Sequence, residues 1–316
     1  MSGRASRALR ESLQRALLLG ASVTATGCLL GESSCPDNGV EPPLTGVVPI
    51  GASEPDPDAE ACRNLCLNRG DGLVTCVRSS PVEVLCIVEP YPCEGRRPHG
   101  WVPALQRESG PFERHLADAA QLEAASIDAF AVLERELCEL GAPRRLLRAA
   151  SRARRDERRH ARISAALARR FRARLDPVVV EPKPRRSVEQ IALDNAIEGC
   201  VRETWGALVV LHQAEHAGEP LIRAAARRIA RDEVFHAQFS WRLDTWFRAR
   251  LSPPARERVL HARNTAIAAL ERELSFDLPA ADRKRLGLPA PLAAKAMLAE
   301  LRESLWTRSA GERARS

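Results

Sequence analysis

From residue 111 onward, apolar residues recur every three or four positions, which is the spacing of one face of an α-helix. The pattern predicts four long helices followed by two shorter ones, at about 111–140, 143–173, 187–217, 220–250, 254–275 and 291–308. The link between the second and third helices is the longest and can cross the length of a bundle. We therefore expect an all-α fold with a four-helix bundle, one long crossover and additional C-terminal helices.

The first 28 residues follow the plan of an export signal. A basic start is followed by a short apolar run at 16–23 and by small residues before Cys28. This ending resembles a bacterial lipoprotein cleavage site, with Cys28 as the lipidated residue, although Ala25 stands where such sites usually carry Leu. An ordinary cleaved signal and a basic leader without structure are the alternatives. The expected location is the bacterial cell envelope, either periplasmic or held at the membrane by a lipid anchor.

Six cysteines lie close together before the helices, at Cys35, Cys62, Cys66, Cys76, Cys86 and Cys93. Such a cluster in an exported chain predicts three disulfides in a small module, which cannot bury a large core of its own. Two short strands are expected at 73–77 and 82–88, around a Ser-Ser-Pro turn. Cys138 and Cys200 stand apart on predicted helices, where buried free thiols are expected.

These features predict five segments in chain order. They are a signal peptide, a disordered linker, a Cys-rich module with its linker, the helical bundle, and C-terminal helices with a tail, at 1–28, 29–60, 61–110, 111–251 and 252–316.

The chain is basic, with a formal net charge of +7 and a pI of about 9.2. Its arginines are interspersed with Glu and Asp along the helical stretches, which predicts solvated helix faces of mixed sign. No nucleic-acid partner is therefore expected. No run of 18 apolar residues occurs, so no transmembrane helix is expected in the mature chain.

The two halves of the helical region repeat each other. Glu123 aligns with Glu198 at an offset of 75 residues. The segment Asp156-Glu157-x-x-His160 aligns with Asp232-Glu233-x-x-His236 at an offset of 76. Each half therefore offers one Glu on its first helix and a Glu-x-x-His on its second.

This spacing suits a metal centre. Positions i and i+3 share one face of a helix, so each Glu-x-x-His pair can bind one ion. The gaps of 34 and 35 residues bring the first Glu of each half level with that pair on the antiparallel neighbour. Four carboxylates and two imidazoles favour iron, or alternatively manganese, over thiolate-bound zinc. Without metal, so many ionisable groups on the apolar stripes would be costly to bury.

Residues 111–251 thus resemble the ferritin-like di-iron carboxylate superfamily, which includes rubrerythrins and bacterioferritins. The resemblance implies two iron ions with six protein ligands, at Glu123, Glu157, His160, Glu198, Glu233 and His236. It also implies that Asp156 and Asp232 orient the ligand histidines from behind. Glu203 is either an additional carboxylate near the site or a solvent-facing residue, and the same holds for Asp128. Relatives often carry Tyr where this chain has Phe130, which argues against a tyrosyl-radical role.

The resemblance implies an oxidase or peroxidase type of di-iron oxidoreductase, acting on O₂ or peroxide. Metal storage without turnover is one alternative. A structural or interaction protein with a degenerate site is another. The chain contains no Cys-x-x-Cys rubredoxin site, so its electron donor is not identified.

Overall fold

The computed structural model describes residues 74–80, 83–88, 96–98, 101–102, 110–180, 184–274 and 278–306. The signal, Cys28 and the linker at 29–60 lie outside the described residues, and so do Cys35, Cys62, Cys66 and Cys93. None of the described helices combines the length and the apolar character needed to span a membrane.

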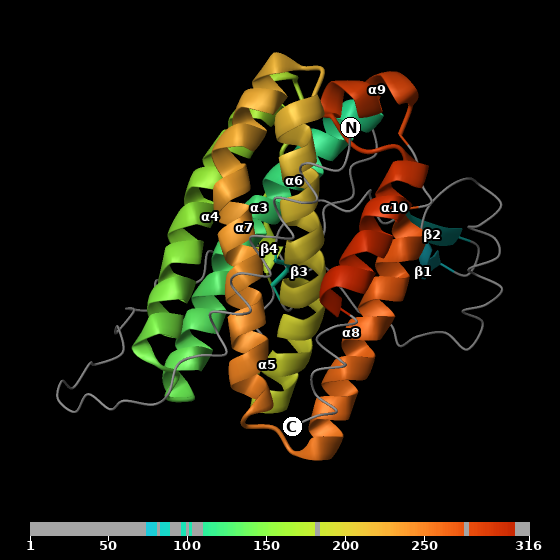
Figure 1. Cartoon of the computed structure of the whole chain (residues 1–316). Helices are drawn as coiled ribbons and strands as arrows, with labels where there is room; N and C mark the ends of the chain where they lie inside the picture. The colour runs from blue at the N-terminus through green and yellow to red at the C-terminus, as the bar shows by residue number, and fades with distance from the viewer. Residues whose placement is uncertain are drawn as a thin grey trace. The chain divides into compact units, whose positions relative to one another are not determined.

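The fold is all-α in its main part, as predicted. Two pairs of long neighbouring helices make up its centre, as Figure 1 shows: α3 (Pro111–Glu139) with α4 (Arg144–Arg170), and α6 (Thr204–His216) with α7 (Pro220–Arg248). Helices α4 and α7 also pack against each other, which joins the two pairs. For α3, α4 and α7, and for the C-terminal end of α6, the observed ends lie within three residues of the predicted ones.

Local sequence explains most of the helix ends. Pro111 and Pro220 each occupy the first turn of a helix, where a missing backbone N–H costs nothing. Gly141 has a φ of 64° and follows α3, in the left-handed conformation that glycine adopts readily. Ser187 and Gln190 form a reciprocal capping box at the start of α5 (Val188–Asp194).

The third predicted helix is not a uniform α-helix. It consists of α5, a π-helical segment η1 (Asn195–Glu203), and α6. A π-helix bonds residue i to residue i+5 and is rare, and short π segments occur frequently at functional sites. The sequence periodicity did not reveal this change of helix type.

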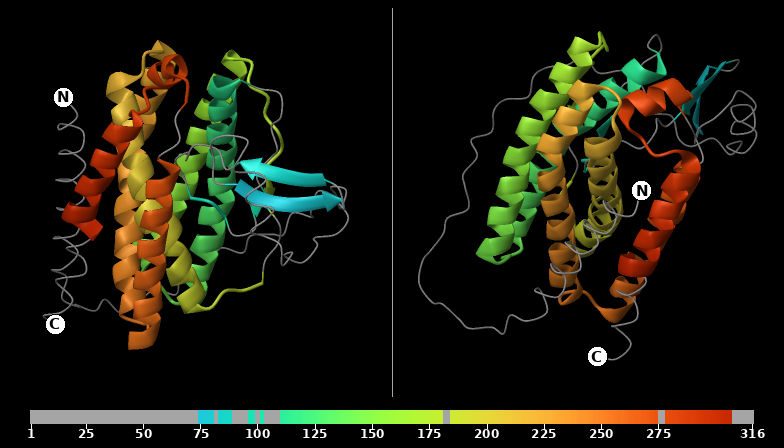
Figure 2. Two further views of the ribbon diagram at one scale, coloured as in Figure 1. Left: turned by 90° about the vertical axis from the view of Figure 1, so that its right-hand side faces the viewer. Right: turned by 45° about the horizontal axis from the view of Figure 1, so that its top comes forward.

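Three further helices follow, α8 (Pro253–Glu273), α9 (Ala280–Leu286) and α10 (Pro291–Leu301), and α10 continues into the π-helical turn η2 (Arg302–Trp306). Figure 2 shows them in orange to red beside the long helices. Helix α8 contacts η1, and the indole Nε1 of Trp306 donates to the Cys200 carbonyl at 3.1 Å. Helix α9 was not predicted from the sequence.

The apolar core is divided along the helices. On α3, Ala120 belongs to one cluster and Phe130 to another, and on α4 Ala153 and Ala168 are separated in the same way. The residues between these positions include Glu123 on α3 and the Asp156–His160 segment on α4. The predicted ligands therefore lie in a polar layer between two apolar layers.

Two small strand pairs accompany the helices. Strands β1 (Val74–Ser80) and β2 (Glu83–Val88) form an antiparallel hairpin in which Cys76 is opposite Cys86, and they belong to a separate unit, Thr24–Glu89. The two predicted strands are thus confirmed. Strand β3 (Trp101–Val102) pairs with β4 (Val179–Val180) in the crossover.

The two helical cysteines differ from each other. Cys200 is buried and free, as expected. Cys138 is half-buried and disulfide-bonded, so the prediction of a free thiol there was wrong.

Candidate metal centre

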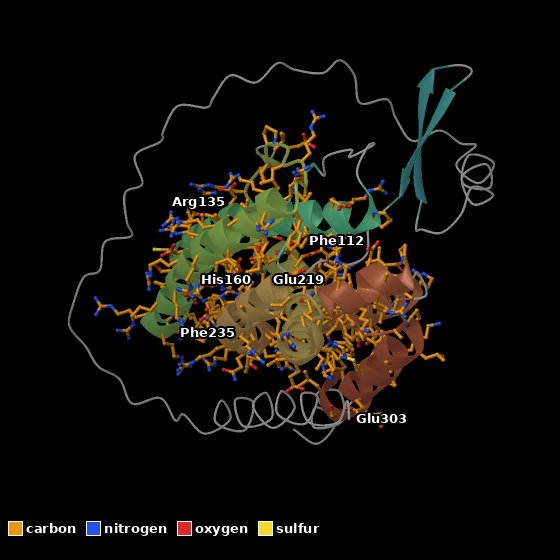
Figure 3. All side chains as sticks on the ribbon, turned by 90° about the horizontal axis from the view of Figure 1, so that it is seen from above. Phe112, Arg135, His160, Glu219, Phe235 and Glu303 are labelled. Atoms are coloured by element: carbon orange, nitrogen blue, oxygen red, sulfur yellow. The ribbon has the colours of Figure 1, made fainter. Side chains whose placement is uncertain are left out.

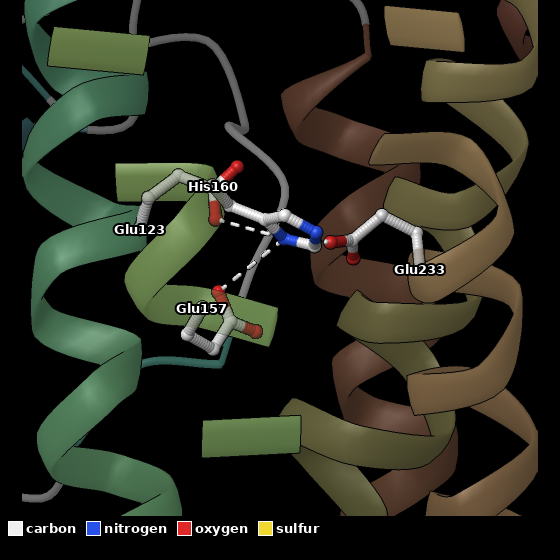
Figure 4. Close-up of side chains that lie close together, drawn as sticks. All are labelled: Glu123, Glu157, His160 and Glu233. Atoms are coloured by element: carbon white, nitrogen blue, oxygen red, sulfur yellow. Dashed lines mark ion pairs between the residues drawn. The ribbon is translucent and has the colours of Figure 1, made fainter. Parts of the chain in front are cut away.

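Buried carboxylates and imidazoles from four helical segments converge between the two helix pairs. One group contains Glu123 of α3, Glu157 and His160 of α4, and Glu233 of α7. Each of these residues offers an atom within 4.8 Å of the others. Figure 4 shows the His160 ring between Glu123 and Glu157 on one side and Glu233 on the other.

The Nδ1 atom of His160 is the focus of this first group. It lies 2.9 Å from Glu233 Oε1, 3.5 Å from Glu123 Oε2 and 3.7 Å from Glu157 Oε2. The His160 ring is fully buried, so these atoms are shielded from bulk water. The arrangement presents one nitrogen and three carboxylate oxygens to a common point.

The second group is built around His236. Glu157, Glu203 and His236 offer atoms within 4.8 Å of one another. His236 Nδ1 lies 3.1 Å from Glu157 Oε1, 3.8 Å from Glu203 Oε2 and 3.7 Å from Glu233 Oε1. Glu157 and Glu233 thus contact both histidines, whose ring centroids are 5.7 Å apart. Two adjacent ion positions that share two carboxylates would fit this geometry.

Each histidine has an aspartate behind it, contributed by the opposite half of the repeat. Asp232 Oδ2 lies 3.4 Å from His160 Nε2, and Asp156 Oδ2 lies 3.7 Å from His236 Nε2. A carboxylate at the outer nitrogen favours the tautomer that leaves Nδ1 as the inner, ligating atom. The predicted position of both aspartates behind the rings agrees with these distances, and the crossing between halves was not anticipated.

Glu198 does not lie with the other predicted ligands. Its Oε2 accepts hydrogen bonds from the backbone N and the Nε of Arg97, both at 3.2 Å. Glu203 takes the corresponding place beside His236 and is fully buried, so of the two sequence alternatives for Glu203 the structure favours the inward one. Asp128, its repeat partner, is exposed.

The π-helix accounts for the inward position of Glu203, whereas the contact with Arg97 holds Glu198 away from the ligand atoms. Along an α-helix, side chains five residues apart point about 140° away from each other. The wider π turn brings residues i and i+5 closer to one side. Because η1 contains both Glu198 and Glu203, its geometry turns the second carboxylate toward the centre. The sequence signal for this was Glu203 itself, an acidic residue five positions after Glu198 on a helix with a strong apolar stripe.

The segment before the helices supplies a buried arginine that sequence reasoning missed. The guanidinium of Arg96, which is 1% exposed, donates to Asn195 Oδ1 at 2.8 Å and Ser240 Oγ at 3.3 Å and pairs with Asp194 at 3.3 Å. It also lies 5.5 Å from the Phe130 ring. Gly199 leaves room for this guanidinium, since a Cβ at that position would collide with it. The positive charge of Arg96 lies close enough to Glu203 to oppose, in part, the effect of burial on the pKa of that carboxyl.

Without metal, the cluster balances its charge with protons. Burial raises the pKa of Glu157 well above its usual range and that of Glu203 to about 7. Burial alone would lower the pKa of His160, but Glu123 and Glu233 raise it to about 12. Burial would likewise lower the pKa of His236, but Glu233, Asp156 and Glu157 raise it. Metal ions compete for these protonated ligand atoms, so metal binding would release protons.

The donor atoms fit divalent metal ions. Several have no hydrogen-bond partner although they are buried: Glu123 Oε2, both oxygens of Glu157 and Glu203, Glu233 Oε2, and Nδ1 of His160 and His236. Unsatisfied buried polar atoms are rare and costly in native proteins. Two ligand atoms about 2.1 Å from one ion and at right angles to each other are about 3 Å apart. The distances of 2.9 Å and 3.1 Å at His160 and His236 agree with that value.

Comparison with protein-family models, with curated proteins and with solved structures finds no match to this chain. The residues of the site form a buried cluster of carboxylates and imidazoles that could hold metal ions, within an all-helical fold.

Proposed function

We propose that this protein is a ferritin-like, di-iron carboxylate protein that activates O₂ or reduces peroxide. The observation that carries the proposal is the set of buried Glu and His atoms that face one another without hydrogen-bond partners. Glu157 and Glu233 would bridge two ions. His160 with Glu123 would complete one position, and His236 with Glu203 the other.

The packing supports a ferritin-like four-helix bundle as the scaffold. The third helical element of that bundle is the composite α5, η1 and α6. The two helix pairs contribute matching Glu-x-x-His ligands, and each adds one further carboxylate, Glu123 in the first half and Glu203 in the second. Oxygen and nitrogen donors without thiolate favour iron or manganese.

The metals would supply the redox chemistry, and the chain supplies its surroundings. His160 and His236 are fully buried, so bulk water does not reach their ligand atoms. Asp156 and Asp232 hold the two rings in the orientation that points Nδ1 inward. Phe130 packs on His236 with ring centroids 5.3 Å apart and provides no phenol to oxidise, so the chain offers no radical relay at this position.

Metal content tests the proposal. The chain, purified after expression with iron, should contain about two ions, and so should a Glu257→Ala/Glu300→Ala control that removes two exposed carboxylates. A Glu157→Ala/Glu233→Ala variant should contain almost none and remain helical. The reduced parent should then consume O₂ or peroxide, and the variant should not. A folded parent that takes up neither iron nor manganese would overturn the di-metal proposal. Stoichiometric metal with no reaction toward O₂ or peroxide would overturn the catalytic part alone.

A further inference from the structure

Helices α4 and α7 place all their acidic residues inside the fold. The acidic residues of α4 are Asp156 and Glu157, and those of α7 are Asp232, Glu233 and Asp244, and all of them are buried. The exposed charges of both helices are therefore arginines only. The expectation of solvated faces of mixed sign was wrong for these two helices, because the acidic partners it counted belong to the interior.

The arginines of α4 form one continuous stripe. They follow each other at intervals of three or four residues, which keeps them on one side of the helix, at Arg145, Arg148, Arg152, Arg155, Arg159 and Arg162. All except half-buried Arg152 are exposed. The stripe is about 26 Å long, given the rise of an α-helix.

Helix α7 presents a matching row beside it, at Arg228, Arg231, Phe235, Gln238 and Arg242. The Arg152 guanidinium stacks on the Phe235 ring at 3.8 Å. Burial and the nearby charge of Arg145 both lower the pKa of Arg242, so the two rows approach each other at this end as well. Figure 3, which looks down on the helices, shows Phe235 on the outer side of the helices and His160 inside. We call these two rows the arginine face.

The arginine face lies directly over the candidate metal centre. The guanidinium of Arg152 pairs with Asp156 at 3.3 Å and with Asp232 at 3.6 Å, and Arg159 pairs with both aspartates as well. These are the carboxylates behind His236 and His160. One carboxylate and one imidazole therefore separate a solvent-exposed arginine from the ligand atoms.

We propose that the arginine face is the docking surface for a small acidic protein that carries one electron at a time. This inference rests on the proposed function, which requires an external reductant. Reduction of one peroxide to two waters consumes two electrons and two protons. Two encounters with a reduced carrier, each of which oxidises that carrier by one electron, supply the electrons, and water supplies the protons.

Charge and position together favour this partner. A surface of one sign attracts a partner of the opposite sign and speeds its association, most strongly at low salt. A nucleic acid or an anionic membrane would also be attracted by charge. Neither would gain from the placement of the arginines on the aspartates behind the ligand histidines, whereas an electron carrier would be brought as close to the metals as the surface allows.

The test uses a plant-type iron–sulfur ferredoxin as the acidic probe and cytochrome c as a basic one. The variant is Arg148→Gln/Arg155→Gln/Arg162→Gln, because none of these three arginines pairs with Asp156 or Asp232. The matched control is Arg272→Gln/Lys284→Gln/Lys295→Gln, which removes the same charge from exposed positions on α8, α9 and α10. Both variants are compared with the parent for metal content and helicity, to verify that the centre is intact.

Calorimetry measures ferredoxin binding to the metal-loaded and the metal-free chain. Stopped-flow spectroscopy measures oxidation of the reduced ferredoxin by the loaded chain. We expect the arginine-face variant to lose about tenfold in affinity and in association rate at low salt, and the control less than twofold, with the difference vanishing at high salt. Cytochrome c should not bind.

Equal losses in variant and control would overturn the docking proposal. So would a loss confined to a DNA duplex or to vesicles of anionic lipid, with ferredoxin binding unchanged. These results leave metal content untouched, so they are distinct from a failure of the proposed function. If the chain holds no metal but the metal-free protein still binds ferredoxin through the arginine face, the docking surface stands and the reaction proposed for it fails.

Discussion

His160 and Asp232 come from opposite halves of the internal repeat and are in contact, with Nε2 and Oδ2 3.4 Å apart. The reciprocal pair, His236 and Asp156, has the same arrangement. Each half of the chain therefore places a carboxylate behind the other half's histidine, and we expect this contact to orient the ring.

Asp232→Asn tests this orientation. The amide keeps the size of the side chain but removes its charge, so it stabilises the required orientation of His160 less well. We expect metal affinity to fall by about 10- to 100-fold, as is typical when a carboxylate behind a ligand histidine is changed. Competition with a chelator measures the affinity. Asp128→Asn is the control, because that aspartate is exposed. An unchanged affinity in Asp232→Asn would show that the contact does not orient the ring.

Substitutions of Glu203 and Glu198 distinguish the ligand set that the geometry favours from the one expected from the repeat. Because Glu203 faces His236 and Glu198 is held by Arg97, Glu203→Ala should reduce the metal content from about two ions to about one. Glu198→Ala should leave the metal content unchanged. Elemental analysis of both variants and of the parent measures the number of metal ions bound per chain. Loss of metal in Glu198→Ala with none in Glu203→Ala would support the ligand set expected from the repeat.

His115 predicts a pH dependence of stability that is separate from the metal site. Burial lowers its pKa to about 4, so the folded chain holds this imidazole neutral. The unfolded chain binds a proton below about pH 6.5, so stability should fall as the pH drops from about 6.5 to 4, by about 3 kcal/mol from this residue. Urea unfolding of the metal-free chain across this range measures the effect.

His115→Gln is the comparison for that measurement, because its side chain does not titrate. The difference in stability between parent and variant should change with pH between about 6.5 and 4 and be constant above pH 7. Parallel stability curves over the whole range would contradict the assignment of this proton to His115.

Gly199→Ala tests the close approach of Arg96 to η1. The added methyl group would come within 2.7 Å of Ser240 Oγ and 2.8 Å of Asn195 Oδ1, and would also meet the Arg96 guanidinium. Overpacking of this kind typically costs about 1–3 kcal/mol. The cost should shrink in an Arg96→Ala background, where the guanidinium is absent. Chemical unfolding of the two single variants and the double variant measures the coupling. Strict additivity would mean that Arg96 is not what Gly199 accommodates.

Much of the fold could be predicted because helical periodicity is a local property. The apolar spacing predicted the four long helical segments to within a few residues at most ends, and prolines explained several starts. The short helix α9 lacked enough turns to show a period, and the π-helix has no distinct apolar pattern. Both depend on packing against neighbouring helices, such as the contact of η1 with α8.

The sequence by itself determined the repeat, and with it five of the residues that the structure brings together: Glu123, Glu157, His160, Glu233 and His236. Two local regularities are sufficient for that: i and i+3 positions share one face of a helix, and the gap of 34 residues brings Glu123 level with Glu157 on the neighbouring helix. The choice of Glu203 over Glu198, the crossed aspartates and the single sign of the arginine face were decided only by the tertiary structure. Each depends on how a charged side chain on one helix is oriented relative to a neighbouring helix. The linear order of residues does not specify that orientation.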